Sequence, residues 1–257
     1  DSRVSRGLGD VYKRQIDRFV HERVIFVGDS AHVVSPFGAR GGNGGIHDVD
    51  NLCWKLARVV RGESDESLLE SYNTERVHGA DENISNSSWT SRFMSPEPGV
   101  EMAFRNAALS LAVDTPFARR VVNAGRLSVP CRLTDSSLNS ADDTGLDVPQ
   151  EIGMVALDAP LKAPDGSPTW LMRQLGGGFA CLVTGDANLD DALVPKGVEL
   201  VRIGAGGFAD AEGKVAERYG SAVYLVRPDQ HVAARWTAPD AADIAAAMAC
   251  CTARVAA

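Results

Sequence analysis

Residues 24–56 constrain the fold of this chain more than any other stretch. They read VIFVGDSAHVVSPFGARGGNGGIHDVDNLCWKL. The run RVIFV at 23–27 is short, β-branched and aromatic and is followed by Gly28 and Asp29, so it predicts a central strand of an α/β sheet. After a glycine-rich loop, apolar residues recur at spacings of three and four, which predicts an amphipathic helix over 45–61 that Gly62 ends. This order is typical of α/β proteins that hold a ligand where the strand gives way to the helix.

The polar groups of this stretch suit a cofactor with hydroxyls and a flat ring. The Asp29 carboxylate can accept hydrogen bonds from a sugar or polyol, and Gly28 lets the backbone turn close to that ligand. Asn43 is predicted as the helix cap, with free N–H groups of the next turn facing negative charge. A reduced isoalloxazine carries such charge at its N1 and O2 edge, although a phosphate suits the site electrostatically too. The loop has little side-chain bulk because it contains Pro36, Gly38, Gly41, Gly42, Gly44 and Gly45.

Glycine content alone leaves a structural alternative open, in which these residues only make turns. The string GARGGNGG does not match the G-x-G-x-x-G dinucleotide fingerprint, and no Lys-Ser/Thr pair follows it as in a P-loop. Two nearby motifs have the same ambiguity. His32 is interpreted as making a structural hydrogen bond, with a proton relay as the alternative. Glu75 and Arg76 in SYNTER are expected to pack and pair their helix, with catalysis as the alternative.

Charge and cysteine content exclude several functions. The net charge is −8, from 26 Lys and Arg against 34 Asp and Glu, and no basic run occurs, so no nucleic-acid partner is expected. No apolar segment approaches the roughly 20 residues of a spanning helix, so no membrane association is expected and the predicted location is cytoplasmic. The five cysteines are scattered, without C-x-x-C or a Cys/His cluster at metal spacing, and the sequence therefore predicts no metal site.

The chain divides into four predicted segments. Residues 1–15 end in DVYKRQ, which resembles a translated sequencing adapter, so we expect this segment to be non-native; a natural polar tail is the alternative. Residues 16–130 form the first domain, and 131–150 are rich in Ser, Asp, Asn and Pro, which indicates a linker. Residues 151–257 contain two strand-like runs, a short helix, a hairpin and a final helix, which predicts a small α/β domain.

Taken together, RVIFVGDSAH, SPFGARGGNGGIHDVDNLCWKLA and SYNTER resemble the second FAD-binding motif of the flavin-dependent aromatic hydroxylases, the para-hydroxybenzoate and phenol hydroxylase group. The resemblance continues through GRLSVP, LGGGFACLV and YLVRPDQHVAARW and covers residues 16–257. It follows the pattern of members with a thioredoxin-like C-terminal domain, such as 3-(3-hydroxyphenyl)propionate hydroxylase-like enzymes. The implied fold class is α/β: part of a doubly wound FAD-binding domain with helices, followed by a thioredoxin-like α/β domain.

The resemblance implies a role for each residue of the motif. Gly28 and Asp29 would lie at the ribityl or ribose region of FAD, with Asp29 as the hydrogen-bond acceptor. Pro36 and Gly38 would line the flavin ring where oxygen is activated, and are the catalytic positions. Gly42, Asn43 and Gly44 would face the pyrimidine edge, and Gly41 is also expected to bind the cofactor. Such enzymes reduce FAD with NAD(P)H and use oxygen to hydroxylate a phenolic ring, so the expected partners are a small aromatic substrate and O2.

Departures from the family pattern lower the expected activity. The family's G-x-G-x-x-G strand, its central Asp-Gly motif and most of its substrate sheet are absent from this sequence, so we expect weak or no FAD binding and no turnover by these residues alone. The C-terminal domain lacks C-x-x-C and is interpreted as a packing or dimerisation module, which is compatible with a homodimer. Two alternatives stay open: a flavoprotein of another reaction, such as a reductase, and a non-enzymatic thioredoxin-like binding module.

Overall fold

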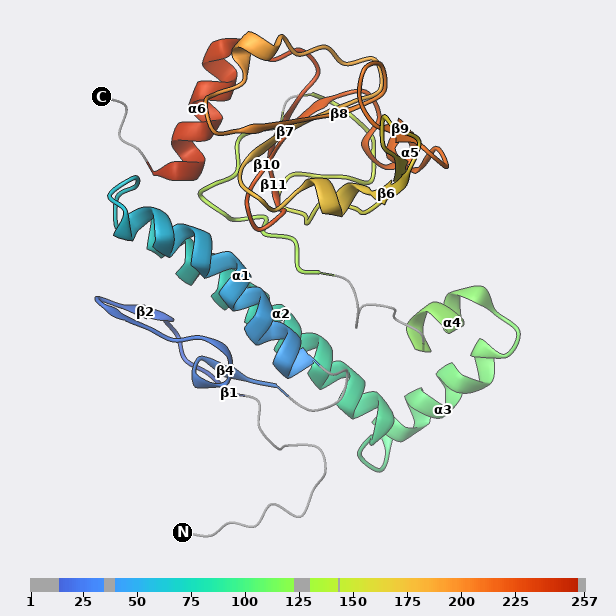
Figure 1. Cartoon of the computed structure of the whole chain (residues 1–257). Helices are drawn as coiled ribbons and strands as arrows, with labels where there is room; N and C mark the ends of the chain where they lie inside the picture. The colour runs from blue at the N-terminus through green and yellow to red at the C-terminus, as the bar shows by residue number, and fades with distance from the viewer. Residues whose placement is uncertain (1–13, 35–39, 123–129, 143, 254–257) are drawn as a thin grey trace. The chain divides into compact units, whose positions relative to one another are not determined.

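The computed structural model describes residues 14–34, 40–122, 130–142 and 144–253 (Figure 1). Pro36 and Gly38 lie outside these residues. The chain mixes helices and strands, as predicted, and divides into two compact units. The first comprises Asp1–Asn51 and Arg76–Cys131, and the second comprises Leu52–Glu75 and Arg132–Ala257.

The first unit begins with two short antiparallel pairings. Strand β1 (Arg14–Gln15) pairs with β4 (His32–Val33), and β2 (Val20–His21) pairs with β3 (Val24–Ile25). Of the predicted central strand at 23–27, only the two residues of β3 form a strand, and in this chain they pair antiparallel with β2 in a hairpin. Val24 is 56% exposed, and β3 has no parallel neighbour among the described residues. A β-branched run favours extended backbone whether its strand is central or at an edge, so composition alone could not separate the two.

Four helices follow, and the first two contribute residues to both units. They are α1 (Arg40–Val60), α2 (Leu68–Met94), α3 (Val100–Ala112) and α4 (Pro116–Val122). Helix α1 begins five residues before the predicted start, so Asn43 lies inside its first turn and is not the cap. Gly62 follows the helix with a left-handed φ of +68°, which confirms it as the predicted stop.

The second unit is built on a four-stranded sheet with strand order β11-β10-β7-β8. Its strands are β7 (Ala180–Thr184), β8 (Glu199–Ile203), β10 (Val223–Val226) and β11 (Val232–Trp236). Strands β7 and β8 are parallel, whereas β10 pairs antiparallel with β7 and β11. A smaller antiparallel sheet, in the order β6-β5-β9, contains β5 (Pro160–Lys162), β6 (Pro168–Trp170) and β9 (Ala209–Asp210).

The larger sheet has an apolar core on each face, because alternate residues of a strand point in opposite directions. Leu182 of β7 and Tyr224 of β10 belong to one core with residues of α5 (Lys214–Tyr219). Cys181 and Leu225 belong to the other, with residues of α6 (Ala241–Thr252). The predicted order of two strands, a helix, a hairpin and a helix is confirmed here (Figure 1).

Four charged side chains are buried together in the second unit, and we call them the charge quartet: Lys55, Glu75, Arg227 and Asp229, each at most 2% exposed. Lys55 Nζ lies 2.6 Å from one Glu75 oxygen, and Arg227 Nη1 lies 2.6 Å from the other. Arg227 Nη2 also contacts Asp229 at 2.5 Å. Burial alone would raise the pKa of Glu75, but Arg227 and Lys55 hold it well below its ordinary value. The quartet has no net charge, which makes its burial tolerable.

None of the helices in the described part of the chain combines the length and apolarity needed to cross a lipid bilayer.

Candidate functional site

The start of α1 lies against the turn that follows β3. Gly28 has a left-handed φ of +60° and belongs to a single 3-10 turn, Gly28–Ser30. A Cβ on Gly45 would lie 3.4 Å from the Gly28 Cα, and a Cβ on Gly28 would lie 3.6 Å from the Gly45 Cα. Glycine at both positions therefore lets two backbones approach closely, and Gly28 also permits the turn. This contact brings Asp29 and the first turn of α1 into one region of the first unit.

The glycines within α1 face different surroundings. Gly42 is exposed, and a Cβ there would meet nothing within 4 Å. Gly44 is buried, and a Cβ there would lie only 3.0 Å from the His32 ring. Gly41 is between these extremes, because a Cβ there would lie 3.8 Å from the Val34 side chain. Packing therefore accounts for Gly44 and Gly45, whereas no neighbour in the described structure accounts for Gly42.

Asp29 and the N-terminal end of α1 present complementary groups to a ligand. Asp29 is exposed and borders a hollow of about 460 Å³ that Gln15, Ile16 and His32 also line. The first N–H groups of an α-helix have no intrahelical acceptor, and they carry the positive end of the helix dipole. In α1 these groups belong to the segment with exposed Gly42 and Asn43, and no acidic residue lies in the first turn. A carboxylate acceptor, helix donors and an uncrowded backbone together fit the hydroxyl chain and the electron-rich ring edge of a flavin.

A buried carboxylate beneath these groups holds them in place. Asp48 is fully buried, and its Oδ2 accepts the Gly28 N–H at 2.9 Å. The same oxygen lies 2.7 Å from His32 Nε2, and Oδ1 accepts from Arg76 Nε at 2.7 Å. We call Asp48, His32 and Arg76 the Asp48 centre. It connects the turn after β3, strand β4, α1 and α2 within the first unit.

The electrostatics of the Asp48 centre favour an ionised carboxylate. Burial alone would raise the pKa of Asp48, but the His32 hydrogen bond, the Arg76 charge and the Gly28 N–H together lower it. Arg76 is 4% exposed, and its Nη2 has no hydrogen-bond partner among the described residues. Removing the Asp48 charge would therefore leave a buried guanidinium without its compensating anion.

The structure brings several predicted site residues together and adds others. Gly28, Asp29, Gly41, Gly42, Asn43 and Gly44 all lie at the turn after β3 or in the start of α1. The structural interpretation of His32 agrees with its bond to Asp48, and Arg76 forms an ion pair as predicted, although its partner lies on α1. Sequence reasoning missed Asp48. The only signal was an acidic residue near a helix start, which the helix dipole already explains.

The sequence of this chain is similar to those of known FAD-binding proteins and monooxygenases. Residues 8–87 match the family model described as an FAD binding domain. The 3-(3-hydroxy-phenyl)propionate/3-hydroxycinnamic acid hydroxylase of Burkholderia cenocepacia is 28% identical over 270 residues, which cover 95% of this chain and 49% of the relative. The tetracenomycin B2 monooxygenase-dioxygenase of Streptomyces olivaceus is 34% identical over 55% of this chain and 23% of the relative.

Solved structures give the same result for the fold. The rebeccamycin biosynthetic enzyme RebC with reduced flavin matches with a TM-score of 0.68 and 27% identity, over 93% of this chain and 46% of that chain. The OxyS anhydrotetracycline hydroxylase from Streptomyces rimosus matches with a TM-score of 0.68 and 26% identity, over 95% of this chain and 47% of that chain. The chain spans about half the length of the Burkholderia hydroxylase and of the two solved structures. In sequence and in fold, the chain is similar to FAD-dependent monooxygenases and hydroxylases.

Proposed function

We propose that the turn after β3 and the start of α1 hold the flavin end of FAD, in a protein that hydroxylates a phenolic or aromatic compound with NAD(P)H and O2. The observation that carries the proposal is the pairing of exposed Asp29 with the open, glycine-containing helix start through the Gly28–Gly45 contact. The matched FAD binding domain at 8–87 contains all of these residues and supports the same assignment.

Each group has a physical task in this proposal. Asp29 accepts hydrogen bonds from the ribityl or ribose hydroxyls, and the N–H groups of the first turn of α1 face the pyrimidine edge. The positive helix end favours negative charge at that edge, and Gly42 leaves room for a flat ring against the backbone. Pro36 and Gly38, which lie outside the described residues, are proposed to line the ring where oxygen reacts. Bound FAD would supply the electron transfer and the reaction with oxygen.

The Asp48 centre supports this site without touching the ligand in our proposal. Its carboxylate fixes the Gly28 backbone and the His32 ring, and Gly44 packs on that ring. The turn that carries Asp29 and the helix start are thus held to one another by a buried charge. Preorganisation of this kind lowers the entropic cost of ordering the site when a ligand binds.

The wider activity rests on the relatives. They include a hydroxylase of 3-(3-hydroxy-phenyl)propionate and a hydroxylase of anhydrotetracycline, and both compounds are aromatic. We propose a small phenolic substrate, a cytoplasmic location with access to NAD(P)H, and a homodimer in which the C-terminal domain takes part. The residues of this chain alone are expected to bind FAD weakly or not at all, and not to turn over.

The test is FAD binding to the chain, measured by quenching of flavin fluorescence. We expect a Kd of about 0.1 mM for the unmodified chain. Asp29→Ala should weaken binding about tenfold, because it removes charge-assisted hydrogen bonds worth about 1.5 kcal/mol. Asp81→Ala is the matched control, since Asp81 is an exposed carboxylate on α2 and does not line the hollow. Equal loss of FAD affinity in both variants would contradict the proposal.

A further inference from the structure

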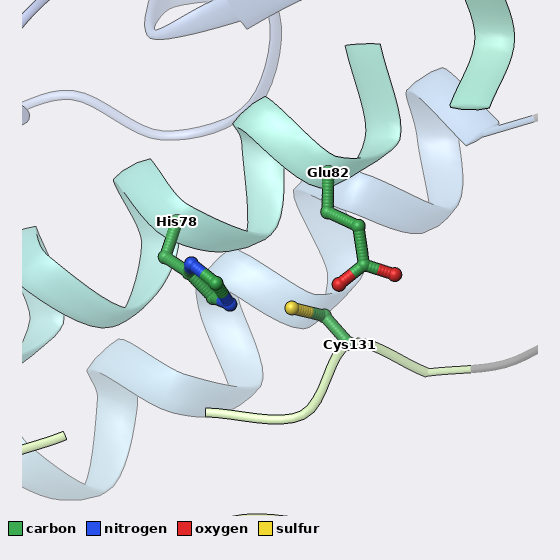
Figure 2. A group of neighbouring side chains, drawn as sticks. All are labelled: His78, Glu82 and Cys131. Atoms are coloured by element: carbon green, nitrogen blue, oxygen red, sulfur yellow. The ribbon is translucent and has the colours of Figure 1, made fainter. Parts of the chain in front are cut away.

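A group of three side chains in the first unit has the composition of a metal site. His78 and Glu82 lie four residues apart on α2, so they share one face of the helix. Cys131, 49 residues beyond Glu82, brings its thiol to that face. Figure 2 shows the imidazole, the carboxylate and the sulfur directed toward one another. One ligand atom from each residue lies within 4.8 Å of the other two.

The three donors match a borderline-soft cation. Imidazole nitrogen, carboxylate oxygen and thiolate sulfur are the ligand types of Zn²⁺, whereas Mg²⁺ and Ca²⁺ prefer oxygen alone. A tetrahedral Zn²⁺ with bonds of about 2.0–2.3 Å brings its ligand atoms to about 3.5 Å apart. Rotation of the long Glu82 side chain and of the imidazole provides the approach that this needs. All three residues are only partly buried, so an ion has access from solvent.

The charges around the group favour a cation. The Glu82 carboxylate lies beside the Cys131 thiol, within the 4.8 Å that encloses the ligand atoms. When the sulfur binds a divalent ion, the ion takes the place of the thiol proton, which passes to water. Arg76 is the nearby positive group, and its charge is already balanced by Asp48 at 2.7 Å. The three proposed ligands would therefore offer a cation one carboxylate, from Glu82, and one thiolate, from Cys131.

We propose that His78, Glu82 and Cys131 bind one Zn²⁺ ion with an open fourth position, and that this ion ties α2 to the segment at Cys131. No local pattern in the chain indicates this group, because Cys131 is far from the other two ligands and only His78 and Glu82 have a regular spacing. The site is separate in role from the FAD residues and does not depend on the proposed hydroxylase activity.

The experiment is cobalt(II) binding to the full chain, followed by optical absorption. Thiolate ligation of cobalt(II) gives a charge-transfer band that carboxylate or imidazole ligation alone does not give. We expect one equivalent of cobalt(II) to produce this band and Zn²⁺ to remove it. Cys131→Ser should abolish the band and weaken binding at least about 100-fold, the upper end of the losses seen even for outer-shell partners.

Two matched controls make the result specific. Cys53→Ser removes an exposed thiol on α1 and should leave the band unchanged. Glu82→Gln should weaken binding at least about tenfold, whereas Asp81→Asn on the exposed neighbouring position should not. Circular dichroism checks that each variant folds, and Glu82→Gln serves as the test if Cys131→Ser does not. The proposal is overturned if the unmodified chain gives no thiolate band in millimolar cobalt(II), or if Cys53→Ser loses the band and Cys131→Ser keeps it.

Discussion

The two units bury charge in different ways. In the first unit a single carboxylate, Asp48, satisfies a backbone N–H, a histidine and an arginine. In the second, the charge quartet balances two cations against two anions beside a sheet with an apolar core on each face. Helices α3 and α4 of the first unit leave large apolar side chains exposed: Val100, Phe104, Leu109, Leu111 and Phe117. The first unit therefore depends more on polar contacts for its geometry. The second depends on apolar packing, and it also requires that the four buried charges of the quartet stay paired.

The largest effect is expected in the quartet. Glu75→Ala removes the anion between Lys55 and Arg227 and leaves both cations buried, which should cost about 3–5 kcal/mol of unfolding free energy. Urea unfolding followed by circular dichroism measures the loss. Glu70→Ala, an exposed position on the same helix, should change stability by no more than about 0.5 kcal/mol. A loss below about 1 kcal/mol for Glu75→Ala would show that the apolar cores alone hold the second unit.

A smaller effect is expected from Asp48→Asn, because the amide keeps the shape of the side chain and loses only the charge. The weakened bonds to His32, Arg76 and Gly28 should cost about 2–3 kcal/mol. The variant should also weaken FAD binding, since the turn with Asp29 loses its anchor. Both effects are measured by urea unfolding and by flavin fluorescence. Stability lost with flavin affinity unchanged would mean that the Asp48 centre supports the fold and not the site.

The glycines at the start of α1 give a contrast on a finer scale. Gly44→Ala should cost about 1–2 kcal/mol, because its Cβ would lie 3.0 Å from a His32 ring that Asp48 holds. Gly42→Ala should be neutral or stabilise by about 0.5 kcal/mol, because its Cβ meets nothing and alanine favours the helix. Thermal unfolding and FAD titration of both variants measure the difference. If Gly42→Ala lowers flavin affinity without lowering stability, the open position serves the ligand; unchanged affinity would remove Gly42 from the site.

The last prediction concerns how the stability contribution of Asp48 changes with pH. The pKa of Asp48 is lowered in the folded state, so its contribution is present above the unfolded value of about 3.9 and is lost as pH falls through the folded value. The stability difference between the unmodified chain and Asp48→Asn should therefore narrow from about pH 5 downward. Urea unfolding of both proteins at several pH values measures it, and the carboxylates of the quartet cancel because both proteins contain them. A difference that stays constant down to acid pH would mean that the charge of Asp48 contributes nothing.

Local sequence determined much of the order of elements. The hairpin of β10 and β11, the strand-like runs at β7 and β8 and the stop at Gly62 follow from apolar β-branched runs and turn chemistry, which act over a few residues. The same signals failed at 23–27, where a strand-like run forms only a short hairpin. They also placed the start of α1 too late, because several glycines and an asparagine read as a loop although the backbone there is helical.

Only the tertiary structure decided where the charges pair. Glu75 and Arg76 are neighbours on α2, yet Glu75 binds Arg227, 152 residues away, and Arg76 binds Asp48. Likewise Cys131 meets His78 and Glu82 across a long separation. Periodicity along one helix indicates which side chains are buried, but a buried charge takes its partner from whichever element packs against it. That choice depends on contacts between distant segments, and a single sequence does not contain them in any local pattern.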